Sequence, residues 1–190
     1  MSRVLPAFAV LALWAAGGSA SANDAADFMA RFSGAWLGTG QLLVGSENGL
    51  KFHCELNGDP SRTQLTFNMS GRCWMGVLSA GVSAQLRYNA ETNRFYGEFM
   101  DGSDGDGLDI VGSRDGDGFS LKLVRGEAQG RLQAEAVNGD QLKVMMFYRD
   151  RMHNRELPVV AMGFSRKDTV QTLPNYMPDI VTGSIAKPTE

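Results

Sequence analysis

The chain has 190 residues, with 18 Lys and Arg against 21 Asp and Glu, and a formal net charge of −3. A mildly acidic chain without a run of Lys or Arg lacks the basic patch by which proteins bind nucleic acid or anionic lipid, so both partners are excluded. The length suits one domain with a real core and disfavours two.

The first residues have the pattern of a secretory signal peptide. Arg3 is followed by an apolar run, residues 4–16, and by small residues that end in Ala20-Ser21-Ala22, which is the signature of export and cleavage. The run is shorter than the roughly twenty residues that a membrane-spanning helix needs, and no Cys follows it to carry a lipid anchor. We therefore expect residues 1–22 to be removed and the mature protein to be periplasmic or secreted, and not membrane-spanning.

Residues 23–33 predict a short helix. Phe28 and Phe32 stand one helical turn apart, Asp24 is a suitable N-cap, and Gly34 is a suitable stop. The helix is expected to lay an aromatic edge against whatever follows it.

From residue 34 onwards, apolar and polar residues alternate with the period of strands that have one buried face. Turn sequences such as SENG, NGDPS, NAETN and RDGDG separate the segments. About ten strands joined by hairpin turns predict an all-β fold, an antiparallel up-and-down β-barrel over residues 34–166. A barrel is favoured over a sandwich because closure removes exposed strand edges. Residues 167–190, with three prolines, are expected to form an extended or disordered tail.

Cys54 and Cys73 are the only two cysteines. In an exported chain they predict a disulfide, which would close a loop of roughly twenty residues and stabilise the fold by around 3 kcal/mol. Two buried thiols are the alternative, and a catalytic dithiol is disfavoured because redox pairs lie closer in sequence. A hairpin turn centred near Asp59 and Pro60 would place Cys54 opposite Leu65, too far from Cys73 for a bond unless the loop is larger or the strand bends.

Gly34-Ala35-Trp36, at the start of the first strand and after a short helix, and Arg166, at the end of the last strand, resemble the calycins, the lipocalin-like exported barrels. The resemblance implies that the Arg166 guanidinium packs on the Trp36 indole, a structural pairing worth about 0.5 to 2 kcal/mol. Lipocalins differ in having eight strands and a helix after the barrel. Residues 33–167 also resemble a group of exported alphaproteobacterial proteins in GAWLGTG, the Cys spacing and VVAMGFSR, a resemblance that implies no activity.

No catalytic motif is visible, because no Ser lies in a Gly-x-Ser-x-Gly elbow and no carboxylate pair stands out; the sequence predicts that the protein is not an enzyme. His53 and His153 are interpreted as solvated side chains, with His153 as a haem ligand the alternative. The acidic stretch from residue 101 to 118 does not have the spacing of a calcium loop and predicts two turns around a strand. No metal and no cofactor are predicted; the only calcium ligands worth testing are Asp101, Asp104 and Asp106.

The leading hypothesis is a non-catalytic, calycin-like exported barrel that binds a small apolar or amphiphilic ligand in its interior. Its candidate lining residues are Phe52, Phe67, Phe95 and Phe99. The frequent Met residues fit either such a lining or ordinary core filling. The alternative is an envelope interaction protein with a filled barrel, either a protease inhibitor or a structural partner. Related inhibitor barrels use a free N-terminal arm, where this sequence predicts a helix, and the interior volume separates carrier from filled scaffold.

Overall fold

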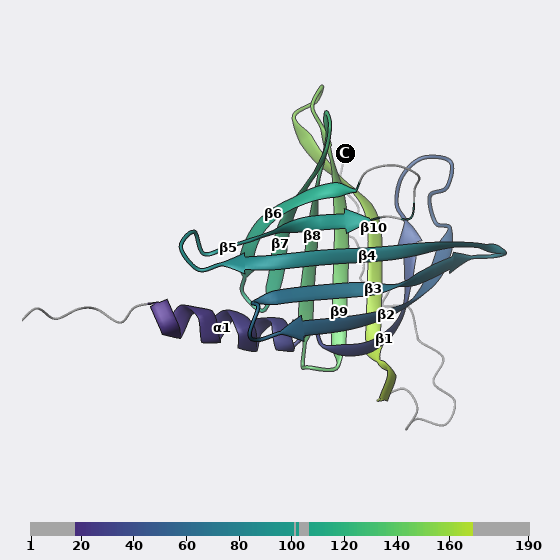
Figure 1. Cartoon of the computed structure of the whole chain (residues 1–190). Helices are drawn as coiled ribbons and strands as arrows, with labels where there is room; N and C mark the ends of the chain where they lie inside the picture. The colour runs from purple at the N-terminus through teal and green to yellow at the C-terminus, as the bar shows by residue number, and fades with distance from the viewer. Residues whose placement is uncertain (1–17, 101, 103–106, 169–190) are drawn as a thin grey trace, which may run out of the picture.

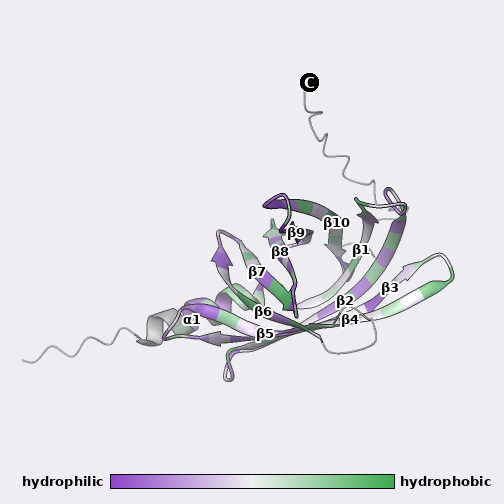
Figure 2. Cartoon of the chain, turned by 90° about the horizontal axis from the view of Figure 1, so that it is seen from above, coloured by the Kyte–Doolittle hydropathy of each residue, from purple (hydrophilic) through white to green (hydrophobic). Residues whose placement is uncertain are grey.

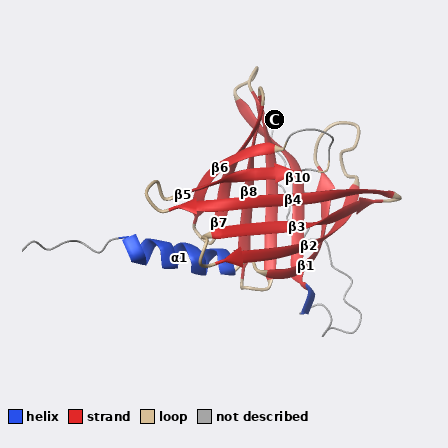
Figure 3. Cartoon of the chain, viewed as in Figure 1, coloured by secondary structure: helices blue, strands red, loops and turns tan. Residues whose placement is uncertain are grey.

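One helix and ten antiparallel strands make up the computed structural model of the chain, which describes residues 18–100, 102 and 107–168 (Figures 1 and 3). Predicted features at residues 1–17, 101, 103–106 and 169–190 lie outside the described residues. The elements, in chain order, are α1 Gly18–Ala30, β1 Gly34–Leu42, β2 Lys51–Ser61, β3 Thr66–Met75, β4 Leu78–Asn89, β5 Arg94–Met100, β6 Leu108–Asp115, β7 Gly118–Arg125, β8 Ala128–Val137, β9 Gln141–Asp150 and β10 Arg155–Arg166.

The strands form a closed barrel in which each pairs with its neighbours in sequence and β10 returns to pair with β1. The seam is in register from Trp36 opposite Arg166 to Leu42 opposite Val160. Seen from above, hydrophobic and hydrophilic residues alternate along the strands as they curve round the barrel (Figure 2), as expected where successive side chains point inward and outward. The predicted all-β, up-and-down barrel of about ten strands is confirmed.

Two inward-facing glycines allow β1 to curve tightly across its neighbours. A Cβ at Gly38 would overlap the Phe164 ring and the Gly163 carbonyl, and a Cβ at Gly40 would overlap the Phe52 ring. The aromatic side chains of β2 and β10 therefore pack directly on the backbone of β1. This close approach explains why the first strand is rich in glycine.

The helix α1 packs against one end of the barrel (Figure 1). Its buried residues Phe28 and Met29, and Phe32 just after it, are at most 2% exposed, and the ring centroids of Phe28 and Phe32 both lie 4.7 Å from that of Phe119 in β7. The helix runs from Gly18 to Ala30 rather than over the predicted residues 23–33, so Asp24 lies inside it and is not its N-cap. Within the described ranges, no helix has the length and hydropathy needed to cross a membrane.

The β2–β3 hairpin corrects the predicted turn. Strand β2 continues through NGDPS to Ser61, which pairs with Thr66, so the turn lies about four residues later than a centre at Asp59 and Pro60. Proline is tolerated at residue 60 because β1 begins at Gly34, opposite Gly58, and leaves the end of β2 as an edge on that side. The shift places Cys54 directly opposite Cys73.

Candidate functional site

The barrel interior holds a cavity of about 360 Å³. It lies between strands from all sides of the barrel, and its wall is almost wholly hydrocarbon and aromatic ring, with Ser83 the only hydroxyl-bearing side chain among the residues that line it. These residues are Phe32, Phe52, Cys54, Leu56, Phe67, Met69, Cys73, Ala80, Val82, Ser83, Ala84, Leu86, Phe99, Ile110, Phe119, Leu121, Leu132, Ala134, Leu142, Val144, Met146, Val160, Met162 and Phe164. The barrel is therefore not packed solid.

The cavity is closed at the α1 end and open towards the other. At the α1 end, inward residues such as Trp36, Phe95 and Phe119 are at most 4% exposed. Towards the other end, the inward residues are only partly buried, among them Phe52 and Met162. The loops 43–50, 76–77, 126–127 and 151–154 lie at that open end, where β5 also ends at Met100 and β6 begins at Leu108.

Three of the four candidate ligand-binding phenylalanines, Phe52, Phe67 and Phe99, line the cavity. The fourth, Phe95, lies beneath it at the closed end, where its ring packs 5.0 Å from Phe119 and 5.2 Å from Tyr88. Phe95 and Phe99 lie on the same inward face of β5. Phe95 packs against Phe28 of α1 at the closed end, whereas Phe99 lines the cavity.

The sequence interpretation missed the small residues that create the space. Ala80, Val82 and Ala84 lie on the inward face of β4, and Ala134 of β8 lines the same cavity. Their period-two spacing is visible in the sequence and identifies the inward face. Whether small inward residues leave a hole depends on what stands opposite them, which only the closed barrel determines.

Cys54 and Cys73 form a disulfide, with Cα atoms 4.1 Å apart and a sequence separation of 19, and both residues line the cavity. The predicted bond is therefore present, and it joins the β2–β3 hairpin directly across the strand pair. It stiffens the wall of the cavity at the level where the interior begins to open.

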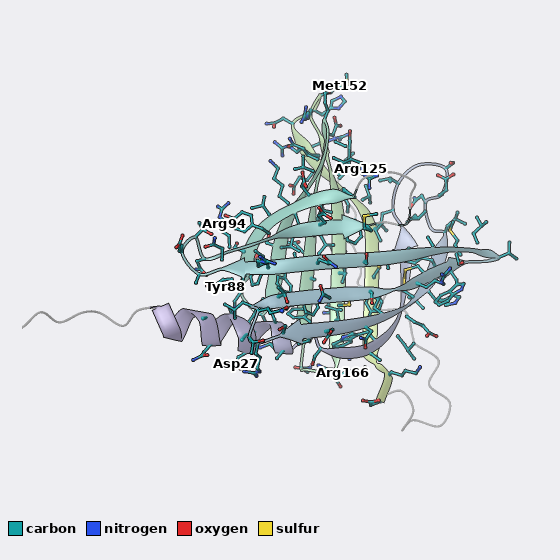
Figure 4. All side chains as sticks on the ribbon, viewed as in Figure 1. Asp27, Tyr88, Arg94, Arg125, Met152 and Arg166 are labelled. Atoms are coloured by element: carbon teal, nitrogen blue, oxygen red, sulfur yellow. A yellow bond between two sulfur atoms is a disulfide. The ribbon has the colours of Figure 1, made fainter. Side chains whose placement is uncertain are left out.

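At the closed end, Arg166 joins the last strand to the first and to the end of the helix (Figure 4). Its guanidinium carbon lies 4.4 Å from the centroid of the Trp36 ring. The guanidinium also donates hydrogen bonds to the backbone carbonyls of Gly139, Ser33 and Arg31, at 2.5, 2.5 and 2.8 Å. Trp36 is fully buried, and its Nε1 donates to the Phe32 carbonyl at 3.1 Å. The pairing holds the α1 end of the barrel closed.

The two histidines lie away from the cavity lining. His53 stacks on Trp74 with ring centroids 5.1 Å apart, on the outward positions beside the disulfide. His153, in the β9–β10 turn, has its Nδ1 2.8 Å from a carboxylate oxygen of Asp150. This hydrogen bond holds the pKa of Asp150 below its usual range, as the Arg131 hydrogen bond does for the pKa of Glu156. Asp150 thus pairs with a side chain in the β9–β10 turn, and Glu156 pairs with Arg131 on the outside of the barrel.

No group of three potential metal ligands comes together among the residues that the structure describes. The candidate calcium ligands Asp101, Asp104 and Asp106 lie outside the described residues.

A second hollow, of about 310 Å³, lies on the outer face of β1, β9 and β10. Outward residues including Thr39, Lys51, Lys143, Met145 and Ala161 line it. Its mixed wall of lysines, amide groups and short apolar side chains offers no enclosed apolar volume. The interior cavity is the better-built site because its wall is continuous and nearly free of polar groups.

A closed antiparallel barrel of ten strands, with a helix packed against one end and an apolar cavity inside, defines an up-and-down β-barrel protein. The solved structures include a similar chain, the S-type phycobiliprotein lyase CPES from Guillardia theta, with 12% sequence identity and a TM-score of 0.49 over 74% of this chain and 90% of that chain. No protein-family model matches the sequence. No curated protein matches it either, so these comparisons do not support the resemblance to exported alphaproteobacterial proteins.

The comparison also corrects one prediction. A missing catalytic motif predicted that the chain is not an enzyme, and that prediction is contradicted because a structure similar to this barrel is titled a lyase. Catalytic residues on a barrel can come from different strands and need no local sequence signature, so a missing motif does not exclude catalysis. At this level of identity, the lyase activity is a property of the other protein.

Proposed function

We propose that the protein binds a small apolar molecule, or the apolar part of an amphiphile, inside the barrel. The observation that carries this proposal is the cavity of about 360 Å³ with its continuous apolar wall. Small-molecule sites in proteins commonly occupy about 300 to 1,000 Å³ and are lined mainly by hydrophobic and aromatic side chains. A filled barrel, which the alternative of an envelope interaction protein assumes, would lack this volume.

The wall determines the chemistry of the ligand. An enclosed polar group would lose its hydrogen bonds to water and find no hydroxyl on the inward face, because Ser83 faces outward between Val82 and Ala84. Each unpaired group would cost about 1–3 kcal/mol. Each buried methylene group instead contributes about 0.8 kcal/mol. The ligand is therefore a hydrocarbon chain or ring system, with any polar group placed at the open end. Flexible thioethers such as Met69, Met146 and Met162 let the wall adapt to its shape.

The expected compartment agrees with this role. A disulfide in the cavity wall suits an oxidising environment outside the cytoplasm, where an apolar molecule needs a carrier to cross an aqueous space. The periplasm or the secreted medium is thus the proposed location.

The test compares two alanine variants. Ala84→Leu adds bulk to the cavity wall, whereas Ala35→Leu makes the same change on an exposed outward position of β1. Titration with the uncharged apolar fluorophore N-phenyl-1-naphthylamine should give saturable binding for the wild type and for Ala35→Leu, with affinity at least tenfold weaker for Ala84→Leu. Equal binding by all three proteins, or none by the wild type, would contradict the proposal.

A further inference from the structure

Exposed hydrophobic side chains gather at the open end of the barrel. Among the described residues, eight large hydrophobic side chains are exposed, and all but Tyr96 and Tyr148 lie in or beside the loops of this end. We call these six residues the apolar rim: Val44, Leu50, Val77, Leu78, Met100 and Met152.

Two tips of the apolar rim project furthest. The β3–β4 hairpin reaches beyond the other strands, and Met152 lies at the tip of the β9–β10 hairpin (Figures 1 and 4). Val77 is 101% exposed and Met152 is 90% exposed, so neither side chain packs on its own chain. Trp74 and Met75 precede the β3–β4 turn, which gives this hairpin an aromatic and aliphatic tip.

The apolar rim is continuous with the cavity wall. Leu50 is two residues before Phe52, and the hydrogen bond from the Leu42 amide to the Leu50 carbonyl continues the β1–β2 pairing to it; Leu78, the first residue of β4, is two residues before Ala80. Side chains two apart in a strand share a face, and both Phe52 and Ala80 line the cavity. An apolar surface therefore runs from the interior along β2 and β4 to the loops at the mouth.

We propose that the apolar rim docks on the surface of a lipid bilayer with the cavity mouth facing the membrane. Separate projecting tips on several loops suit a fluid bilayer, which receives each tip without matching its shape, whereas a protein partner must complement them all. The driving force is burial of aliphatic side chains at the headgroup boundary. Because the chain lacks a basic run, docking does not depend on anionic lipid.

The purpose of docking in this orientation rests on the proposed function, the binding of an apolar ligand in the cavity. An apolar ligand that passes between the bilayer and the cavity would stay in contact with the apolar rim, without crossing water. The substrate class is then a membrane-soluble hydrocarbon or amphiphile.

The test is sedimentation with phosphatidylcholine vesicles, which carry no net charge. The variant Val77→Ser/Met152→Ser removes the two most exposed tips, and Tyr96→Ser removes an exposed aromatic side chain from the outer side of β5 as the matched control. Wild type and Tyr96→Ser should sediment with the vesicles and be indifferent to salt. The double variant should partition at least about tenfold more weakly, the factor expected from losing one buried aliphatic contact.

Three results would overturn the proposal: no sedimentation of the wild type, equal sedimentation of the double variant, or binding that requires anionic lipid and disappears at high salt. A vesicle-free dimer that the double variant abolishes would also overturn it, because a second copy of the chain would then cover the apolar rim. Titration with N-phenyl-1-naphthylamine without vesicles keeps the two proposals apart. The double variant should bind the fluorophore within twofold of the wild type, since Val77 and Met152 are not among the residues that line the cavity.

Discussion

Replacing Arg166 by Ala removes the contact that joins the first strand, the last strand and the end of α1. The guanidinium lies 4.4 Å from the centre of the buried Trp36 ring, a cation–π contact worth about 0.5 to 2 kcal/mol. It also donates three hydrogen bonds to backbone carbonyls, each worth about 1 kcal/mol net at a partly exposed site. Partial rehydration of the carbonyls lowers the total, so Arg166→Ala should reduce the free energy of unfolding by about 2–4 kcal/mol.

Urea unfolding measures this loss. With a slope near 2 kcal/mol per molar urea, the midpoint should fall by about 1–2 M while the slope stays unchanged. Arg166→Lys should recover less than half of the loss, because an ammonium group lacks the planar fork that reaches several carbonyls at once. The control is Arg114→Ala, whose guanidinium lies 5.0 Å from the Phe28 ring beside an exposed carboxylate partner, and which should cost less than about 1 kcal/mol. An Arg166→Ala midpoint within error of the wild type, or full recovery by Lys, would show that the guanidinium does not stabilise this end of the barrel.

Three further predictions concern the wall, the seam and one turn. Replacing both Cys54 and Cys73 by Ser removes a covalent link between residues with a sequence separation of 19, and should lower the free energy of unfolding by about 3 kcal/mol. Urea unfolding against the oxidised wild type measures this loss, and an unchanged midpoint would contradict it. Gly38→Ala introduces a Cβ that overlaps its neighbours, whereas a Cβ at Gly163 meets nothing within 4 Å. Thermal unfolding should show that Gly38→Ala lowers the free energy of unfolding by about 1–3 kcal/mol and that Gly163→Ala changes it little. Equal melting temperatures for the two variants would contradict the close packing at Gly38. Because the pKa of Asp150 is lowered in the folded state, its contribution to stability is present above its ordinary pKa and is lost as the pH falls through the lowered value; Asp150→Asn should be less stable than the wild type at pH 7, and a difference that persisted at pH 2 would contradict this.

The sequence predicted the architecture because the barrel repeats one local rule. Alternation with period two identifies each strand, turn residues separate the strands, and a run of hairpins with no helical interruption leaves few topologies other than an up-and-down barrel. The seam was also visible, because Trp36 and Arg166 stand at the two ends of the sheet and face each other across it.

The β2–β3 turn could not be predicted because NGDPS has the composition of a turn. Its position in the strand depends on where β1 begins, opposite Gly58, which is a property of the assembled sheet. An error of a few residues in this turn also made the disulfide look unfavourable, although the two cysteines are direct partners.

The cavity was equally hidden. Phe52, Phe67, Phe95 and Phe99 share an inward pattern in the sequence, yet α1 packs beneath Phe95 and leaves the other three on the cavity wall. Interior volume depends on the sum of side chains across all ten strands, so no local pattern reports it.

Methyl NMR of the cavity methionines reports whether an apolar ligand occupies the interior of the barrel. In protein labelled with ¹³C at the methionine methyls, addition of N-phenyl-1-naphthylamine should shift the signals of Met69, Met146 and Met162, which line the cavity, and give intermolecular nuclear Overhauser effects to them. Met145 on the outer hollow and the exposed Met152 should be unaffected. Contacts confined to Met145 or Met152, or no contact with the three interior methyls at saturation, would show that the ligand does not bind inside the barrel.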